Sequence, residues 1–197
     1  MNTFRSVLQK FDETLRKYNK PNYDLLRPPL PPEEVAHKMA QLGLADEQLK
    51  AWFGWKTGAM PSDYDPGPKE LGTVFFMLAS PLSLDSIIRH QKTSQAGSWW
   101  ESHFVPIAAD GGGLYLLFNS MPGENYGRIY LFCPSLLVID PEICYDSLQT
   151  LLETTIAACE QGIAYYDEEQ EDLDFDSKKY RKLAAKMNSH TEYFKEG

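Results

Sequence analysis

Residues 167–176 contain seven acidic side chains and no basic one. Like charges this close repel one another, which favours a solvated loop. The same stretch could instead be an interaction surface, because clustered acids attract a basic partner. Leu173 and Phe175 alternate with acids, so a short extended stretch could dock one face and present the acids on the other. The candidate partner-binding acids are Asp167, Glu168, Glu169, Glu171, Asp172, Asp174 and Asp176.

Tryptophan provides the other candidate contact. Trp52 falls at the core spacing of a predicted short helix and is expected to be packing. Trp55 lies at the ragged end of that helix, beside Lys56 and near Gly58. It could pack into the core or stand exposed in a cleft, and the Trp99–Trp100 pair presents the same choice. We include Trp55 among the candidate partner-binding residues.

No group of residues has the spacing of a catalytic or metal site. The four histidines lie far apart and there is no Cys-x-x-Cys pair. Cys144, His103 and Asp146 could form a catalytic constellation only through geometry that a sequence does not supply. The acidic stretch begins like a calcium loop, but Ser177 and Leu183 stand where that loop needs glycine and glutamate. We therefore expect no catalytic residue, no metal site and no enzymatic activity.

The glycine run Gly111–Gly113 invites comparison with a phosphate-binding loop. Such a loop follows a strand and precedes a helix, so that backbone amides point at the anion. Here a predicted strand follows the glycines, and no Lys-Ser/Thr pair is present. The run therefore predicts a tight hairpin turn, in which glycine supplies positive φ without strain. We expect neither a nucleotide nor any other cofactor.

The charge balance narrows the range of partners. The chain has 197 residues with 19 basic and 28 acidic side chains, a net charge of −9. General binding to nucleic acid or to an anionic membrane needs a basic surface, so we expect neither. No run of 18 apolar residues is present, and Met1–Ser6 lacks the apolar stretch of a signal peptide. The three cysteines lie in apolar runs and are expected to be buried and reduced, which fits a cytoplasmic protein.

Hydrophobic spacing predicts helices, then a meandering sheet, then helices. The expected helices cover about 3–18, 33–42, 46–55, 84–90, 148–162 and 178–194, with caps at Asn2 or Thr3, Asp46 and Ser83. The expected strands cover 73–79, 104–108, 114–118, 127–132 and 136–139. Short turns between the strands favour antiparallel pairing. The order predicts a single α+β domain with a twisted, mainly antiparallel sheet flanked by helices. Residues 1–163 would form this domain, and 164–197 an acidic loop and final helix packed on or appended to it.

The order of these elements and their amino-acid sequence resemble those of the SUKH superfamily over about residues 25–163. The first part of the resemblance comprises Pro31-Pro32-Glu33-Glu34, Leu42-Gly43-Leu44 and Trp55-Lys56-Thr57-Gly58. The most specific part is Trp99-Trp100 followed by Phe104-Val105-Pro106-Ile107-Ala108-Ala109-Asp110-Gly111-Gly112-Gly113. The Leu-rich helix 148–162 is similar to the family's closing helix.

The resemblance implies a binding module rather than an enzyme. Many bacterial members are immunity proteins, which look like intracellular antidotes that bind and block a toxin domain, often a nuclease or deaminase. An acidic inhibitor suits such a partner, since a nuclease must be basic to hold phosphates. We therefore expect a cytoplasmic immunity protein whose partner is a basic toxin domain. The alternative is a regulatory scaffold of the kind found among the yeast cell-wall-assembly regulators of the same superfamily.

Overall fold

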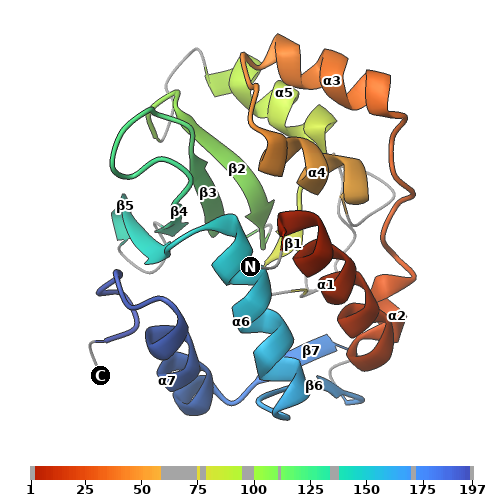
Figure 1. The fold of residues 1–197 in the computed structure, drawn as a ribbon, viewed down its shortest axis with the longest axis vertical. Helices are drawn as coiled ribbons and strands as arrows, with labels where there is room; N and C mark the ends of the chain where they lie inside the picture. The colour runs from red at the N-terminus through yellow and green to blue at the C-terminus, as the bar shows by residue number, and fades with distance from the viewer. Residues whose placement is uncertain are drawn as a thin grey trace.

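The computed structural model describes residues 3–58, 75, 79–94, 100–110, 112–133, 138–169 and 172–195 (Figure 1). The described helices are α1 (Phe4–Tyr18), α2 (Lys20–Tyr23), α3 (Pro32–Gln41), α4 (Glu47–Trp55), α5 (Leu84–Ser94), α6 (Leu148–Glu160) and α7 (Ser177–Met187). The strands are β1 (Ser80–Pro81), β2 (Phe104–Ala109), β3 (Tyr115–Asn119), β4 (Ile129–Cys133), β5 (Val138–Tyr145), β6 (Ala164–Asp167) and β7 (Asp172–Phe175). The predicted α+β class is confirmed.

The main sheet is a five-stranded meander in the order β1-β2-β3-β4-β5, and each of these pairings is antiparallel. The strands predicted over 104–108, 114–118 and 127–132 are confirmed as β2, β3 and β4 of this sheet. Pro106 interrupts the ladder of the interior strand β2, and the register shifts there between Pro106 and Ala108. A bulge at this point is expected, because proline cannot donate to the ladder.

Several of the predicted elements differ from the structure, and one lies mostly outside it. The helix predicted over 84–90 continues to Ser94 as α5, and the acidic loop predicted after residue 163 contains the paired strands β6 and β7. The strand predicted over 136–139 continues to Tyr145 as β5, because Pro141 is tolerated in a strand at the sheet's edge. The helix predicted over 178–194 ends at Met187, where Asn188 caps it through a backbone bond to the Ala184 carbonyl. The strand predicted over 73–79 lies largely outside the described residues.

Side-chain caps begin several helices as predicted. Thr3 accepts a bond from the amide of Ser6, and Asp46 accepts one at 2.8 Å from Leu49. Ser83 likewise accepts a bond of 3.0 Å from the Ser86 amide at the start of α5. Each cap satisfies a backbone N–H that has no partner within the helix. The one-turn helix α2 was not predicted from the sequence.

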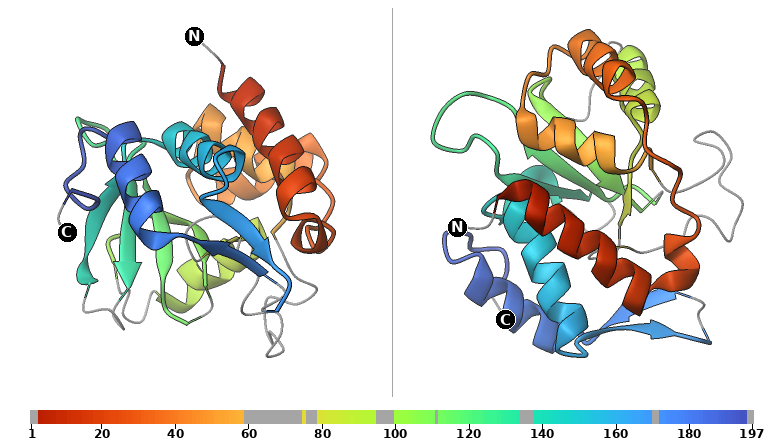
Figure 2. Two further views of the ribbon diagram at one scale, coloured as in Figure 1. Left: turned by 90° about the horizontal axis from the view of Figure 1, so that it is seen from below. Right: turned by 45° about the vertical axis from the view of Figure 1, so that its right-hand side comes forward.

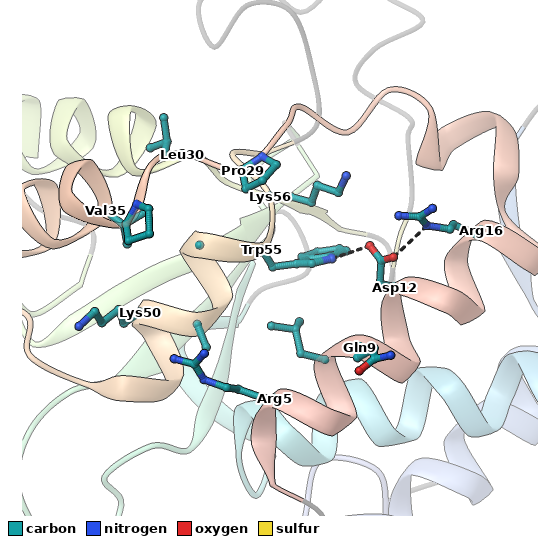
Figure 3. Close-up of a pocket in the computed structure, with 14 residues that line it drawn as sticks. Arg5, Gln9, Asp12, Arg16, Pro29, Leu30, Val35, Lys50, Trp55 and Lys56 are labelled. Carbon is teal, nitrogen blue, oxygen red and sulfur yellow. Dashed lines mark hydrogen bonds and ion pairs between the residues drawn. The ribbon is translucent and has the colours of Figure 1, made fainter.

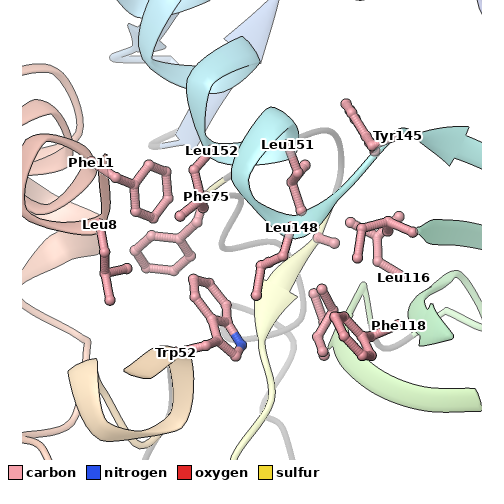
Figure 4. Close-up of a cluster of buried hydrophobic side chains, with 14 of the residues drawn as sticks. Leu8, Phe11, Trp52, Phe75, Leu116, Phe118, Tyr145, Leu148, Leu151 and Leu152 are labelled. Atoms are coloured by element: carbon pink, nitrogen blue, oxygen red, sulfur yellow. The ribbon is translucent and has the colours of Figure 1, made fainter. Parts of the chain in front are cut away.

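Helix α6 runs through the centre of the molecule between α1 and α7, as the views in Figures 1 and 2 agree. Leu148, Leu151 and Leu152 of α6 are fully buried and meet Phe11 of α1 and Trp52 of α4 in one cluster (Figure 4). Alternate residues of β3 and β4 point into this cluster, as the two-residue period of a strand requires. The remaining residues of those strands form a smaller cluster on the other face, with Leu117, Tyr130 and Phe132.

The residues after 163 share this core. Leu173 of β7, Tyr180 and Ala184 of α7, and Phe194 all belong to the main hydrophobic cluster. The hydroxyl groups of Tyr180 and Tyr145 lie 2.7 Å apart, and the rings of Tyr145 and Phe194 lie at 5.3 Å. Burial of these large side chains holds the C-terminal segment against α6 and the sheet.

Candidate functional site

A cleft of about 610 Å³ lies between α1, α4 and the segment 29–35 that leads into α3 (Figure 3). Its volume falls within the roughly 300–1,000 Å³ of ligand pockets. Helix α1 contributes Arg5, Leu8, Gln9, Asp12 and Arg16. The connecting segment and the start of α3 contribute Pro29, Leu30, Pro32 and Val35. Helix α4 and its C-cap contribute Lys50, Ala51, Gly54, Trp55 and Lys56. The cleft therefore depends on three separate segments of the first 56 residues.

Helical periodicity decides which side chains reach the cleft. Arg5, Gln9, Asp12 and Arg16 of α1 recur every three or four positions, so they form one stripe, and Leu8 lies beside it. Phe11 lies on the adjacent stripe and is fully buried. On α4, Trp52 and Trp55 are three residues apart. Trp52 is 2% exposed and lies in the core, whereas Trp55 is half-buried and lines the cleft. The rings of Phe11 and Trp52 lie 6.5 Å apart in the core beneath, which fixes the two helices relative to each other.

The two carboxylate oxygens of Asp12 accept hydrogen bonds from side chains of α1, α2 and α4. Oδ1 accepts hydrogen bonds from Trp55 Nε1 at 2.7 Å and from the Tyr23 hydroxyl at 2.8 Å. Oδ2 accepts a charge-assisted bond from Arg16 Nε at 2.9 Å. Because the indole N–H of Trp55 already has this partner, Trp55 offers a ligand only apolar ring surface.

Two of the cations near Asp12 pack against the ring of Tyr23. The Arg16 guanidinium lies 4.8 Å from the centre of the Tyr23 ring, and the Lys56 ammonium lies 4.9 Å from it. Both distances are within the range of a cation–π interaction. The nearby Asp12 carboxylate raises the pKa of Arg16, and burial is the main cause of the raised pKa of Tyr23. At neutral pH, Arg16 is therefore charged and Tyr23 keeps its proton.

The cleft has the opposite sign of charge from the protein as a whole. Among its lining residues that the structure describes, four are basic and one, Asp12, is acidic. The pairing of Asp12 with Arg16 leaves an excess of three cations, Arg5, Lys50 and Lys56, in a protein of net charge −9. Among the described residues, the ammonium group of Lys50 pairs with the exposed carboxylate of Glu47 at a long distance, 3.7 Å. Exposed contacts of this kind contribute little.

The acidic stretch is a second surface, built on an antiparallel hairpin. Strand β6 pairs with β7, with Ala164 opposite Phe175 and Asp167 opposite Asp172. Leu173 is 3% exposed and anchors β7 in the core, while the Phe175 ring packs on Tyr180 at 5.1 Å. The expected extended stretch with one face docked is therefore present.

The seven candidate acids do not form a single uniform face. Asp172 accepts a 2.6 Å bond from Asn22, and Asp174 accepts one of 3.1 Å from the Tyr165 hydroxyl. Asp176 caps α7 and pairs with Lys179 at 2.9 Å. Each of these three acids contributes to holding the hairpin or the helix that follows.

The acids nearer the turn differ in their surroundings. Glu168 and Glu169 are exposed, and Asp167 accepts a 2.8 Å bond from the Glu169 amide. Glu171 lies outside the described residues. The exposed charge of the stretch therefore gathers at the turn of the hairpin.

Trp55 and the acidic hairpin lie on different parts of the molecule. Trp55 bonds to the middle of α1, whereas the hairpin contacts α2, beyond the end of α1. Figures 1 and 2 place the hairpin at the opposite end of the molecule from α3 and α5. The sequence pointed to Trp55 but not to Asp12 or the surrounding cations. The signal that was available is the polar stripe from Arg5 to Arg16 at helical spacing.

The catalytic constellation considered from the sequence is unsuited to nucleophilic chemistry. Cys144 is fully buried, its thiol donates to the Ile129 carbonyl at 3.4 Å, and burial raises its pKa. A protonated, enclosed thiol is inert as a nucleophile. His103 lies 3.3 Å from exposed Glu101, and Asp146 accepts a long bond from the His190 amide. Across the described ranges, no three His, Cys, Asp or Glu side chains gather as a metal site.

The glycine turn connects β2 to β3 as a hairpin, as predicted. Gly111 lies outside the described residues. Oδ1 of Asp110 accepts hydrogen bonds from the amides of Gly112 at 2.7 Å and Leu114 at 2.9 Å. The aspartate carboxylate thus occupies amides that a phosphate group would need.

Comparison of the chain with models of known protein families gives no match, and comparison with curated proteins gives none either. In the part of the chain that the structure describes, no helix has the length and apolar character needed to cross a membrane.

Proposed function

We propose that this protein is a non-catalytic binding module, a cytoplasmic immunity protein that binds and neutralises a basic toxin domain of the nuclease or deaminase type. The observation that carries the proposal is the acidic turn of the β6–β7 hairpin. Glu168 and Glu169 are exposed there, on a hairpin that Leu173 anchors in the core. The SUKH resemblance supports the same class of protein.

Anchoring matters because a preordered surface loses less conformational entropy on binding. The bond from Asn22 to Asp172 and the cap of α7 by Asp176 hold the two ends of β7. Exposed acids on such a support attract a basic partner from a distance and speed its association. Binding alone suffices for neutralisation, so this chain needs no chemistry of its own.

A regulatory scaffold is the second candidate function. It is favoured by the presence of two separate surfaces of opposite charge, the acidic hairpin and the basic cleft. A scaffold would engage two partners at once, whereas an immunity protein needs one tight interface.

The test uses the product of the reading frame adjacent to this protein's gene, purified and mixed in a stopped-flow instrument. The variant replaces Glu168, Glu169 and Glu171 with glutamine, which leaves Asp172 and Asp176 in place. A control with the same charge change replaces Glu33, Glu101 and Glu124, which lie on other surfaces. We expect the hairpin variant to associate at least about tenfold more slowly at low salt, with the gap closing as salt rises. An unaltered rate, or an equal loss in the control, would contradict the proposal.

A further inference from the structure

The cleft between α1 and α4 combines an excess of positive charge with an apolar floor. Leu8, Val35 and Trp55 supply apolar surface, while Arg5, Lys50 and Lys56 are not neutralised by the single lining carboxylate. Figure 3 shows Arg5, Lys50 and Lys56 on different sides of Trp55, and Asp12 between Trp55 and Arg16. Arg5 forms no ion pair with any residue that the structure describes. Cations held near one another over apolar surface favour a ligand that is itself anionic and partly apolar.

The spacing of the cations favours an extended ligand over a compact anion. Arg5 and Arg16 lie on one face of α1 and are 11 residues apart, which corresponds to about 16 Å along a helix that rises 1.5 Å per residue. A single phosphate group cannot contact both. An extended peptide rises about 3.3 Å per residue, so roughly five residues span this distance.

Gly54 gives an independent indication that the cleft is kept open. It lies within α4 and lines the cleft, and a Cβ atom added to it would meet nothing within 4 Å. Packing therefore does not require glycine here, although glycine is less favourable than alanine in a helix. A side chain at this position would project into the space beside Trp55. Glycine at position 54 leaves room there for an apolar group of a ligand.

We propose that this cleft binds an extended acidic segment of a partner protein, with an apolar side chain seated beside Gly54 and Trp55 and carboxylates paired with the cations of the cleft. The cleft lies on a different surface from the acidic hairpin, and its occupant is acidic where the hairpin's is basic. Binding of an acidic segment in the cleft is therefore independent of the proposed immunity function, and each can be tested without the other.

The test measures binding of a fluorescein-labelled, amidated pentapeptide, four glutamates around a central leucine, by fluorescence anisotropy at low salt. The same peptide with glutamine for glutamate is the uncharged comparison. We expect saturable binding of the acidic peptide, at least about tenfold tighter than that of the glutamine peptide. Absence of saturable binding, or equal affinity for the two peptides, would overturn the proposal.

Variants locate the peptide in the cleft. Gly54→Leu should weaken binding at least about tenfold by filling the space, and the thermal midpoint of the folded variant verifies that the helix is intact. The double variant Arg5→Gln/Lys50→Gln should weaken binding about tenfold, with the difference narrowing as salt rises. Its matched control is Lys182→Gln/Lys186→Gln, which removes two exposed cations from α7. Undiminished binding in Gly54→Leu, or equal losses in the two double variants, would refute the location.

Two competing occupants give different results. If millimolar inorganic phosphate displaces the peptide as well as unlabelled peptide does, the cleft binds small anions and the peptide assignment is wrong. If sedimentation shows a dimer that Gly54→Leu dissociates, the occupant is the acidic hairpin of a second copy rather than a partner protein. A monomer that binds the acidic peptide and ignores phosphate supports the proposal.

Discussion

Asn22 donates a 2.6 Å hydrogen bond from Nδ2 to Oδ1 of Asp172, 150 positions further along the chain. The bond joins the turn of helix after α1 to the first residue of β7. Asn22 is buried, so its amide would have no water to replace this partner. The contact therefore holds the start of β7, next to the acidic turn, against the N-terminal helices.

Replacing Asp172 with alanine should lower the free energy of unfolding by about 1–3 kcal/mol, because it leaves a buried donor unsatisfied. Urea denaturation measures the change. Asp174→Ala is the matched control, since its partner Tyr165 is 45% exposed and can bond to water. The control should change stability by less than about 0.5 kcal/mol. Equal losses of stability in the two variants would show that the Asn22–Asp172 bond contributes no more to folding than the exposed Tyr165–Asp174 bond.

Gly54→Ala should stabilise the protein by about 0.5–1 kcal/mol, because alanine is the better helix former and its Cβ meets open space. Gly43→Ala is the matched comparison. A Cβ there also meets nothing within 4 Å, but Gly43 has φ of 69°, which is strained for alanine. We expect Gly43→Ala to be destabilising in the same thermal melt. A destabilised Gly54→Ala would mean that the helix needs glycine for a reason that packing does not explain.

The stabilisation that Asp176 provides should disappear in acid. The side chain and amide of Lys179 hydrogen-bond to its carboxylate and lower its pKa below the ordinary value. A carboxyl group with a lowered folded-state pKa stabilises the fold above its unfolded pKa, and loses this effect as pH falls through the folded value. Asp176→Asn retains a good cap without the charge.

The stability difference between wild type and Asp176→Asn should therefore be largest near neutral pH and shrink on acidification. Urea titrations at stepped pH values measure it. In a Lys179→Gln background the pH dependence of the difference should be much weaker. A difference that stays constant down to the acid transition would be inconsistent with a charge effect at this cap.

The cysteines should resist thiol reagents in the folded protein. Cys133, Cys144 and Cys159 are each at most 2% exposed, and burial raises the pKa of Cys159 to about 12. The thiolate is the reactive form, so both access and ionisation disfavour labelling. A chromogenic disulfide reagent at neutral pH should label none within minutes, and all three in denaturant. One thiol that reacts at once in the native protein would contradict the structure.

Local patterns in the sequence were enough for much of the fold. Apolar residues at helical spacing predicted α1 and α6, and Thr3, Asp46 and Ser83 were recognised as caps, because these signals act within one or two turns of the chain. The alternation of Leu173 and Phe175 with acids similarly anticipated an extended stretch that docks one face. Such features depend on neighbours in the sequence, so the sequence contains the information to predict them.

The sites required contacts between distant parts of the chain. Trp55 was a candidate, but its partner Asp12 is 43 positions away, and nothing at either position alone indicates the bond between them. The structural role of Asp172 likewise depends on Asn22, which belongs to another element. Burial of Phe11 against Trp52 and α6 sets how α1 and α4 lie relative to each other. That packing is decided by the whole core, and so tertiary structure determines which polar stripes face each other across a cleft.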